Sequence, residues 1–209
     1  MDVRQVYSHY DLEGTPIAGL YRYCPICGCE LVAAELGHRY LPSCSGCGFV
    51  QFRNPAPTVS LLIEKGGMVL LGKRRGHPGK GTWALPSGYI DYDEDFLSAA
   101  IREAKEETGL EVRIRSIVQV LSSFVSPRYH FLGLYLAADV IGGQPEAGDD
   151  LEAVGWYPIA GPLPDMGFEE DSYVIGLCAT GAASGLPVDP RHSGTPGRED
   201  ETRAPEPSG

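Results

Sequence analysis

The stretch from Gly88 to Leu110 constrains the fold more than any other part of this 209-residue chain. Its apolar residues recur at the i, i+3, i+4, i+7 spacing that lines one face of an α-helix: Leu97, Ala100, Ile101 and Ala104. The pattern predicts a helix from Asp95 to Thr108. Gly109 follows directly, and a glycine accepts the left-handed backbone conformation in which many helices end.

Three glutamates form a second, acidic face on this predicted helix. Glu103, Glu106 and Glu107 fall at i, i+3 and i+4, so their carboxylates crowd together and repel one another. Such a face is ordinarily a solvated surface. The alternative is a site for a hard divalent cation such as Mg²⁺, which prefers oxygen ligands. The residues around the glutamates decide between the two interpretations.

Read as Gly-x5-Glu-x7-Arg-Glu-(small apolar)-x-Glu-Glu-x-Gly-(apolar), residues 88–110 resemble the Nudix box without a break. With its flanks, the resemblance covers Pro55 to Ala183. It implies an α+β fold, the Nudix α/β/α sandwich. It also implies an enzyme that cleaves a nucleoside diphosphate linked to some other moiety.

The resemblance also implies a set of catalytic and metal-binding residues. By position, Mg²⁺ or Mn²⁺ is expected to bind Glu103, Glu106, Glu107 and the backbone carbonyl of Ser87. Glu106 is either a ligand or the base that activates water, and Arg102 is expected to hold a box carboxylate, with Glu94 as its partner. We therefore expect Glu106, Glu103 and Arg102 to be catalytic.

The resemblance implies a general base that lies either in the box or in a later acidic loop. That loop offers Glu146, Asp149, Asp150 and Glu152. Relatives often place an acid shortly before an aromatic pair, which Trp156-Tyr157 matches here. Glu152 or Asp150 fits this role, although solvent exposure is the alternative for each.

Four further residues are candidates for substrate binding: Arg74, Phe124, Tyr129 and Glu152. Lys73-Arg74-Arg75 closes a predicted strand and is either a solvated strand end or a source of charge for phosphates. Phe124 and Tyr129 either line a base- or flavin-binding pocket or belong to a strand core or hairpin tip.

Two Cys-x-x-Cys pairs, each followed by glycine, precede the box region: Cys24, Cys27, Cys44 and Cys47. Four thiolates form a closed tetrahedral Zn²⁺ site, so this metal is expected to be structural. A pair of disulfides is the alternative. Cys29 and Cys178 are left over, and we interpret them as ordinary thiols, with Cys29 as a competing ligand.

The chain order predicts four segments: an N-terminal arm at 1–20, a zinc ribbon at 21–54, a Nudix domain at 55–183 and a disordered, Pro- and Gly-rich tail at 184–209. Within the Nudix domain, runs from Val59 and Met68 predict a hairpin around Lys65-Gly66-Gly67. Further strands are expected over 112–120, 131–140 and 151–157, and a closing helix over Met166–Ala183.

Composition limits the partners of this chain. The net charge is −11 and the isoelectric point about 4.8, which argues against polyanion binding by bulk charge. A phosphate substrate remains compatible, because bound cations invert the local field. There is no signal peptide pattern and no run of the ~20 apolar residues that span a membrane, so we expect a cytoplasmic protein.

A four-cysteine ribbon before a Nudix domain resembles the NADH pyrophosphatases and the zinc-ribbon FAD and ADP-ribose pyrophosphatases. The resemblance implies release of AMP and a second monophosphate from a dinucleotide. Residues 122–130 do not match the Ser-Gln-Pro-Trp-Pro-Phe-Pro element of the NADH enzymes. The alternatives are a nucleoside-triphosphate pyrophosphatase and a nucleotide-sensing or nucleic-acid-binding protein. Relatives are commonly homodimers.

Overall fold

The computed structural model describes residues 21–126, 129–182 and 185–188. Its contacts divide the chain into two units. The first contains the described residues up to Ala56 together with Ser122–Leu132, and the second contains Pro57–Leu121 and the described residues from Gly133 onward. The predicted arm at 1–20 and the predicted tail beyond residue 188 lie outside the described residues.

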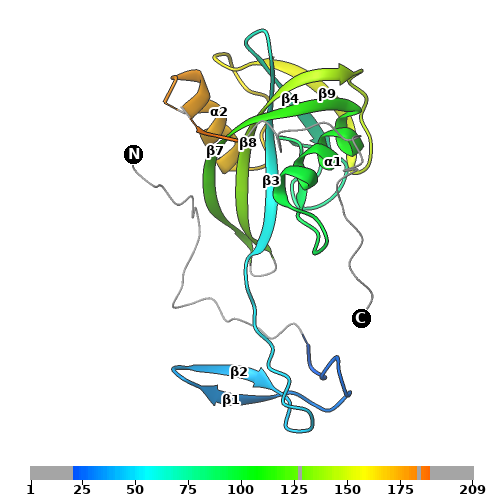
Figure 1. The fold of residues 1–209 in the computed structure, drawn as a ribbon, viewed down its shortest axis with the longest axis vertical. Coiled ribbons are helices and arrows are strands. Elements are labelled where there is room, and N and C mark those ends of the chain that lie inside the picture. The colour runs from blue at the N-terminus through cyan, green and yellow to red at the C-terminus, as the bar shows by residue number, and fades with distance from the viewer. Residues whose placement is uncertain (1–20, 127–128, 183–184, 189–209) are drawn as a thin grey trace, which may run out of the picture. The chain divides into compact units, whose positions relative to one another are not determined.

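The first unit is built around a small hairpin. Strands β1 (Val32–Leu36) and β2 (Arg39–Ser43) pair antiparallel, with Val32 opposite Ser43 and Leu36 opposite Arg39 (Figure 1). One Cys-x-x-Cys pair precedes this hairpin in the chain and the other follows it. The hairpin therefore connects the two halves of the thiol cluster.

The second unit contains most of an eight-stranded sheet and, among the described residues, two helices. The sheet has the order β10-β7-β8-β3-β4-β5, while β6 also pairs with β3 and β9 with β4. The elements are β3 (Ala56–Lys65), β4 (Met68–Arg74), β5 (Trp83–Ala84), β6 (Ser87–Tyr89), α1 (Phe96–Thr108), β7 (Leu110–Ser126), β8 (Tyr129–Gly143), β9 (Leu151–Pro158), α2 (Glu169–Ala179) and β10 (Leu186–Pro187). The two helices flank the sheet (Figure 1), which is the predicted sandwich.

Helix α1 begins and ends where the sequence predicted. Asp95 is its N-cap, and the Asp95 carboxylate accepts hydrogen bonds from Leu97 N at 2.8 Å and Ser98 N at 3.1 Å. Gly109 ends the helix at φ 69°, in the left-handed region, and donates its N–H to Lys105 O. Local chemistry at both ends therefore defines the element that carries the box.

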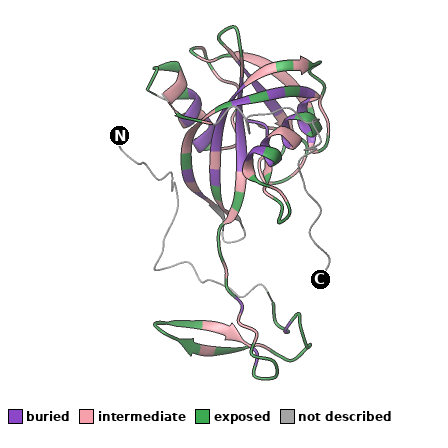
Figure 2. Ribbon diagram, viewed as in Figure 1, coloured by how far each residue is buried: buried purple, intermediate pink, exposed green. Residues whose placement is uncertain are grey.

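The faces of α1 differ from the predicted pattern in one respect. Its buried residues include Leu97, Ala99, Ala100 and Ala104 of the core cluster, but also Glu103, Glu107 and Thr108. In Figure 2, the helix accordingly carries both buried and exposed residues. Only Glu106 of the three box glutamates is exposed. The solvated-face interpretation therefore fails for Glu103 and Glu107.

Two other segments differ from the sequence predictions. The closing helix begins at Glu169 rather than Met166, because the backbone before it pairs with Trp83 instead: Trp83 N donates to Asp165 O and Gly167 N to Trp83 O, both at 2.8 Å. The described start of the predicted tail forms β10, in which Leu186 pairs with Ile117 of β7.

No helix in the described part of the chain is long and apolar enough to cross a membrane.

Candidate active site and thiol cluster

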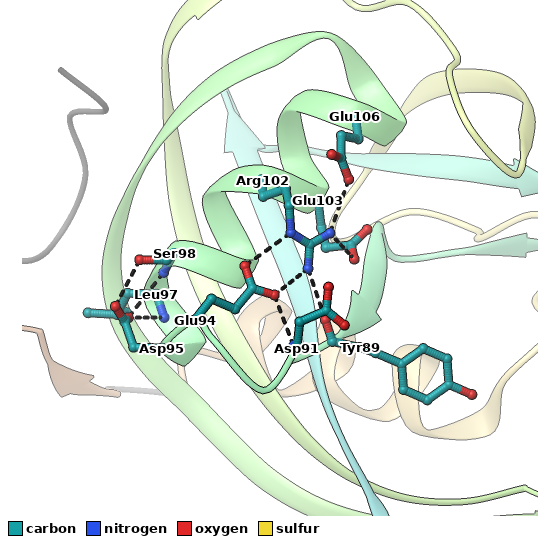
Figure 3. A network of polar contacts seen from close by, with 9 residues as sticks. All are labelled: Tyr89, Asp91, Glu94, Asp95, Leu97, Ser98, Arg102, Glu103 and Glu106. Carbon is teal, nitrogen blue, oxygen red and sulfur yellow. Dashed lines mark hydrogen bonds and ion pairs between the residues drawn. The ribbon is translucent and has the colours of Figure 1, made fainter.

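Arg102 is the centre of a polar network at the start of the box (Figure 3). Its Nε and Nη2 donate to the Glu94 carboxylate at 3.0 and 2.5 Å. Its Nη1 donates to Glu103 Oε1 at 2.7 Å and to Glu106 Oε2 at 3.0 Å, and Nη2 also donates to Tyr89 O. One guanidinium thus joins three box carboxylates, and its hydrogen bond lowers the pKa of Glu94.

Glu103 lies against the backbone of β6, the strand that precedes α1. Its side chain is buried, and a Cβ atom on Gly88 would lie 1.9 Å from Glu103 Oε1. Glycine is therefore required at position 88 for this carboxylate to keep its place. Burial raises the pKa of Glu103, and the neighbouring Arg102 partly offsets that effect.

Glu107 is the most deeply buried box carboxylate. It is 1% exposed, and its Oε2 accepts a hydrogen bond from Ser87 N at 2.8 Å. Burial, followed by the nearby Asp150 carboxyl, raises the pKa of Glu107 to about 9, although the Ser87 N–H acts in the opposite direction. A carboxylate in this setting favours a proton or a cation.

The loop at 146–150 is fastened to the last turn of α1. Glu146 N donates to Thr108 O at 2.9 Å, and Gly148 N donates to Glu107 O at 3.0 Å. A Cβ atom at Gly148 would lie 2.2 Å from Glu106 O, so only glycine allows this approach. These bonds use carbonyl groups that a helix end leaves free, and they place the following acids beside the box.

Asp150 faces Glu107 and carries an unsatisfied oxygen. Its Oδ1 is buried with no hydrogen-bond partner among the described residues, while Oδ2 accepts from Arg74 Nη2 at 3.1 Å. A buried acceptor without a donor is costly unless a cation or water satisfies it. Carboxylate oxygens are the donors that a hard divalent cation such as Mg²⁺ or Mn²⁺ prefers. Among the described residues, however, only the four cysteines, and not these acids, form a cluster of three or more metal-binding side chains.

The predicted substrate residues lie in different surroundings. Arg74 is 12% exposed in its side chain, donates Nε to Pro78 O and stacks over Phe168. Glu152 instead pairs with Lys73 at 2.7 Å, and this hydrogen bond lowers the pKa of Glu152. Hence Asp150, and not Glu152, is the later-loop acid that reaches Glu107.

The two aromatic candidates belong to the first unit. Phe124 contacts His130 edge to face, with ring centroids 5.7 Å apart. The side chain of Tyr129 lies outside the described part of the chain. Their assignment to a base- or flavin-binding pocket stays a prediction.

The four paired cysteines form one cluster. The Sγ atoms of Cys24, Cys27, Cys44 and Cys47 all lie within 4.8 Å of one another. The closest Sγ pairs are 3.4 and 3.5 Å apart, far longer than the ~2.05 Å of a disulfide, and all six cysteines are free thiols. The disulfide alternative is therefore wrong for this structure.

The two Cys-x-x-Cys turns have the same geometry. Gly28 and Gly48 both adopt φ 77°, and each donates its N–H to the backbone carbonyl of the first cysteine of its pair, at 2.9 and 3.0 Å. Each turn contributes one buried thiol, Cys24 or Cys44, and one exposed thiol. Four soft sulfur donors in a tight group fit a tetrahedral metal ion, as predicted for zinc.

Comparison with known proteins identifies the family of the chain. Residues 53–176 match the model of the NUDIX domain, more than half of the chain, so the chain belongs to the Nudix hydrolase family. It is 37% identical over 124 residues to the ADP-ribose pyrophosphatase of Methanocaldococcus jannaschii, a match that covers 59% of this chain and 73% of that protein.

The chain is also similar to two further proteins, at lower identity. It is 28% identical over 148 residues to the NAD-capped RNA hydrolase NudC of Pseudomonas aeruginosa, covering 68% of this chain but only 50% of NudC, so the chain spans about half the length of that relative. The crystal structure of a NUDIX hydrolase from Nitrosomonas europaea superposes with a TM-score of 0.67 at 23% identity, over 77% of this chain and 91% of that one. This last likeness shows the fold.

Arg102 provides a direct test of the network in Figure 3. We expect Arg102→Lys to lower kcat by about 10–100-fold, because an ammonium cannot reproduce the planar fork that joins three carboxylates. Steady-state kinetics on the substrate found for the wild-type protein measure this. Arg113→Lys is the matched control, since Arg113 pairs with Asp139 on the surface, where ion pairs contribute little. Equal losses in both variants would contradict the role of Arg102.

The buried carboxyls predict an unusual pH dependence of stability. The pKa of Glu107 rises from 4.5 to about 9 on folding and that of Asp171 from 3.8 to about 7. The folded protein then holds more protons than the unfolded chain above pH 4.5, so its free energy of unfolding falls as the pH rises toward 9.

Urea unfolding at several pH values, without added Mg²⁺ or Mn²⁺, measures this trend. Added Mn²⁺ should reduce the fall in the free energy of unfolding at high pH, because Mn²⁺ binds the ionised form of a carboxyl ligand. Glu107→Gln should flatten the curve above pH 8, where Asp171 has largely titrated. A free energy of unfolding that rises from pH 6 to pH 9 would contradict the prediction.

Proposed function

We propose that this protein hydrolyses the pyrophosphate bond of a nucleoside diphosphate derivative of the ADP-ribose, FAD or NADH class, with a divalent cation, and releases AMP and a second monophosphate. The observation that carries the proposal is the pair of neighbouring carboxyls, the buried Glu107 and the part-exposed Asp150, in the same box helix region as the Arg102 network. Of the relatives, the ADP-ribose pyrophosphatase, of which the chain covers 73%, favours ADP-ribose as the first substrate to test.

The chemistry requires neutralised charge and an oriented water. Divalent cations, when bound, polarise the phosphoryl oxygens and lower the pKa of a coordinated water. The residues that would hold them are Glu103, Glu106, Glu107 and the carbonyl of Ser87. Arg102 holds Glu103 and Glu106 at fixed positions before the substrate arrives, so less reorganisation is needed during the reaction.

The general base is assigned to the loop that follows β8. We place it at Asp150, because its part-exposed carboxyl group lies beside that of Glu107. We expect Asp150→Asn to lower kcat by about 10²–10⁴-fold, the usual contribution of general base catalysis.

Glu152→Gln is the matched control for this assignment. It is the same change of acid to amide two residues further along, at a side chain paired with Lys73, and it should leave kcat within about twofold, since an exposed ion pair contributes little. Steady-state kinetics of both variants under saturating Mn²⁺ make the comparison. A large loss in Glu152→Gln with an active Asp150→Asn would reverse the assignment.

Incubation with a panel of substrates tests the proposed function. Purified protein with Mg²⁺ or Mn²⁺ is given ADP-ribose, FAD, NADH and nucleoside triphosphates, and the products are separated by ion-exchange chromatography. AMP together with a second monophosphate is the expected result. Release of inorganic pyrophosphate from a triphosphate would replace the proposal with the nucleoside-triphosphate pyrophosphatase, and no product from any substrate would end it.

Two further assignments accompany this function. We propose Zn²⁺ as the ion of the cysteine cluster, in a purely structural role, because four thiolates leave no open coordination position. NAD-capped RNA is a second candidate substrate, favoured by the NudC relative. Adding capped RNA to the panel and sizing the protein by light scattering test that substrate and the predicted homodimer.

A further inference from the structure

Asp171 is a buried carboxyl on α2 that the proposed chemistry does not use. It is 4% exposed and lies in the first turn of the helix. Its Oδ2 accepts a hydrogen bond from Leu85 N at 2.9 Å, across 86 positions in the chain. Burying an acid here is unfavourable unless its contacts are specific, so the contact with Leu85 is the feature to explain.

A chain of hydrogen bonds supports Asp171 from the sheet. Ser60 of β3 donates to the phenol oxygen of Tyr135 on β8, and the Tyr135 hydroxyl donates to Asp171. Both Ser60 and Tyr135 are buried. Asp171 is therefore held from two sides, and its position is set before any substrate binds.

Leu85 begins the short segment that leads into the box. Leu61 N donates to Pro86 O at 2.9 Å, Ser87 lies opposite Ser60 in the β3–β6 pairing, and Ser87 N donates to Glu107. The segment is thus attached to α2 at Leu85, to the sheet at Pro86 and to α1 at Ser87. Asp171 provides the side-chain attachment to α2.

We propose that Asp171 is a positioning residue for the metal site: by accepting the Leu85 N–H, it keeps the Ser87 carbonyl and Gly88 in place against Glu103 and Glu107. This inference rests on the proposed role of the Ser87 carbonyl as a metal ligand. If Asp171 has this role, α2 helps to hold the metal site in place although the metal-binding carboxylates are not on α2.

The positioning role predicts a particular pattern among variants. Asp171→Leu and Asp171→Ala remove the acceptor, and we expect the Mn²⁺ dissociation constant to rise and kcat to fall by about 10–100-fold each, as for other residues that support metal ligands. KM for the substrate should change by less than about threefold, because uniform substrate binding is not affected. Asp171→Asn keeps an oxygen for Leu85 N and should retain near wild-type values.

Tyr135→Phe is the control for a merely structural effect. It removes the hydrogen bond to Asp171 within the same buried network but leaves the Leu85 contact, so it should lower the melting temperature without changing the Mn²⁺ dissociation constant. Asp171→Ala serves if the larger leucine prevents folding, and all constants are measured well below each melting temperature.

Mn²⁺ binding is measured by electron paramagnetic resonance on substrate-free protein with its ribbon loaded with zinc, and kinetics follow on the active substrate. Equal losses in Asp171→Asn and Asp171→Leu, or an unchanged Mn²⁺ dissociation constant in Asp171→Leu, would overturn the proposal. A rise in KM with unchanged kcat would also overturn it and assign Asp171 to substrate contact. If the wild-type protein cleaves no substrate, the proposed function fails, whereas the Mn²⁺ constants still decide the role of Asp171.

Discussion

Glu107→Gln is expected to lower kcat by about 10³-fold, equal to about 4 kcal/mol of transition-state stabilisation. The amide keeps an oxygen that can accept the Ser87 N–H, so the local backbone contact survives. It removes the negative charge with which the side chain would bind a divalent cation beside Asp150, and that cation supplies several kcal/mol of charge stabilisation. Steady-state kinetics across a range of Mn²⁺ concentrations measure the loss.

Stability should change in the opposite direction in the same variant. The buried carboxyl of Glu107 has a pKa of about 9 in the metal-free protein, which means that its ionised form is unfavourable there. A neutral amide removes this cost, so the melting temperature without metal should stay equal or rise at pH 8. The rise in melting temperature that Mn²⁺ gives the wild-type protein should disappear.

Glu111→Gln is the matched control, because Glu111 is an exposed acid paired with Lys105 just beyond the same helix. It should retain both kcat and the Mn²⁺ effect. Full activity of Glu107→Gln, or an unchanged Mn²⁺-dependent rise in its melting temperature, would remove Glu107 from the metal site.

Cys44→Ser is expected to abolish zinc binding and unfold the ribbon. Only three of the residues from 21 to 51 are buried, and two of them are the metal-facing thiols: Cys24, Cys44 and Gln51. The larger apolar side chains there are mostly exposed, among them Tyr21, Tyr23, Ile26, Val32 and Tyr40. A core this small cannot hold the fold, whereas a zinc site supplies roughly 10–16 kcal/mol.

The measurements are zinc content by atomic absorption and amide hydrogen exchange over residues 21–51. The wild-type protein should hold one zinc per chain with protected amides in β1 and β2, and Cys44→Ser should lose both. Cys178→Ser is the control, since Cys178 is a half-buried thiol on α2 outside the cluster. A folded, zinc-free ribbon in Cys44→Ser would show that the metal does not hold it together.

Local chemistry made the box helix predictable. Asp95 as N-cap and Gly109 at φ 69° define α1 by contacts within a few residues, and such contacts are readable in the sequence. The hairpin of β3 and β4 was likewise predictable from Lys65-Gly66-Gly67, and Lys65 does pair with Met68. In both cases the signal and its consequence lie within the same short segment.

Contacts between distant segments were not predictable in the same way. The burial of Glu103 depends on Gly88 and that of Glu107 on Ser87, and helical spacing alone places all three glutamates on an acidic face. The start of α2 is delayed by a backbone pairing with Trp83, 82 positions before Asp165. Periodicity within one segment contains no information about such partners.

Asp150 and Glu152 differ in their surroundings because of an irregularity in strand pairing. In the pairing of β4 with β9, Lys73 lies opposite Ala153 and Arg74 opposite Leu151, so Glu152 is the extra residue of a bulge. A bulge changes where neighbouring side chains point, and it separates two acids that look equivalent in the sequence. Asp150 turns to Glu107 and Arg74, while Glu152 turns to Lys73.

The matched cysteine turns have a consequence for metal exchange. Each turn presents one sulfur to the interior and one, Cys27 or Cys47, to solvent. A competing chelator can therefore replace the two exposed thiolates as ligands of a bound ion while Cys24 and Cys44 still hold that ion. We expect the ribbon to exchange its zinc by stepwise ligand substitution from solvent, at a rate that rises with chelator concentration and without prior opening of the buried half.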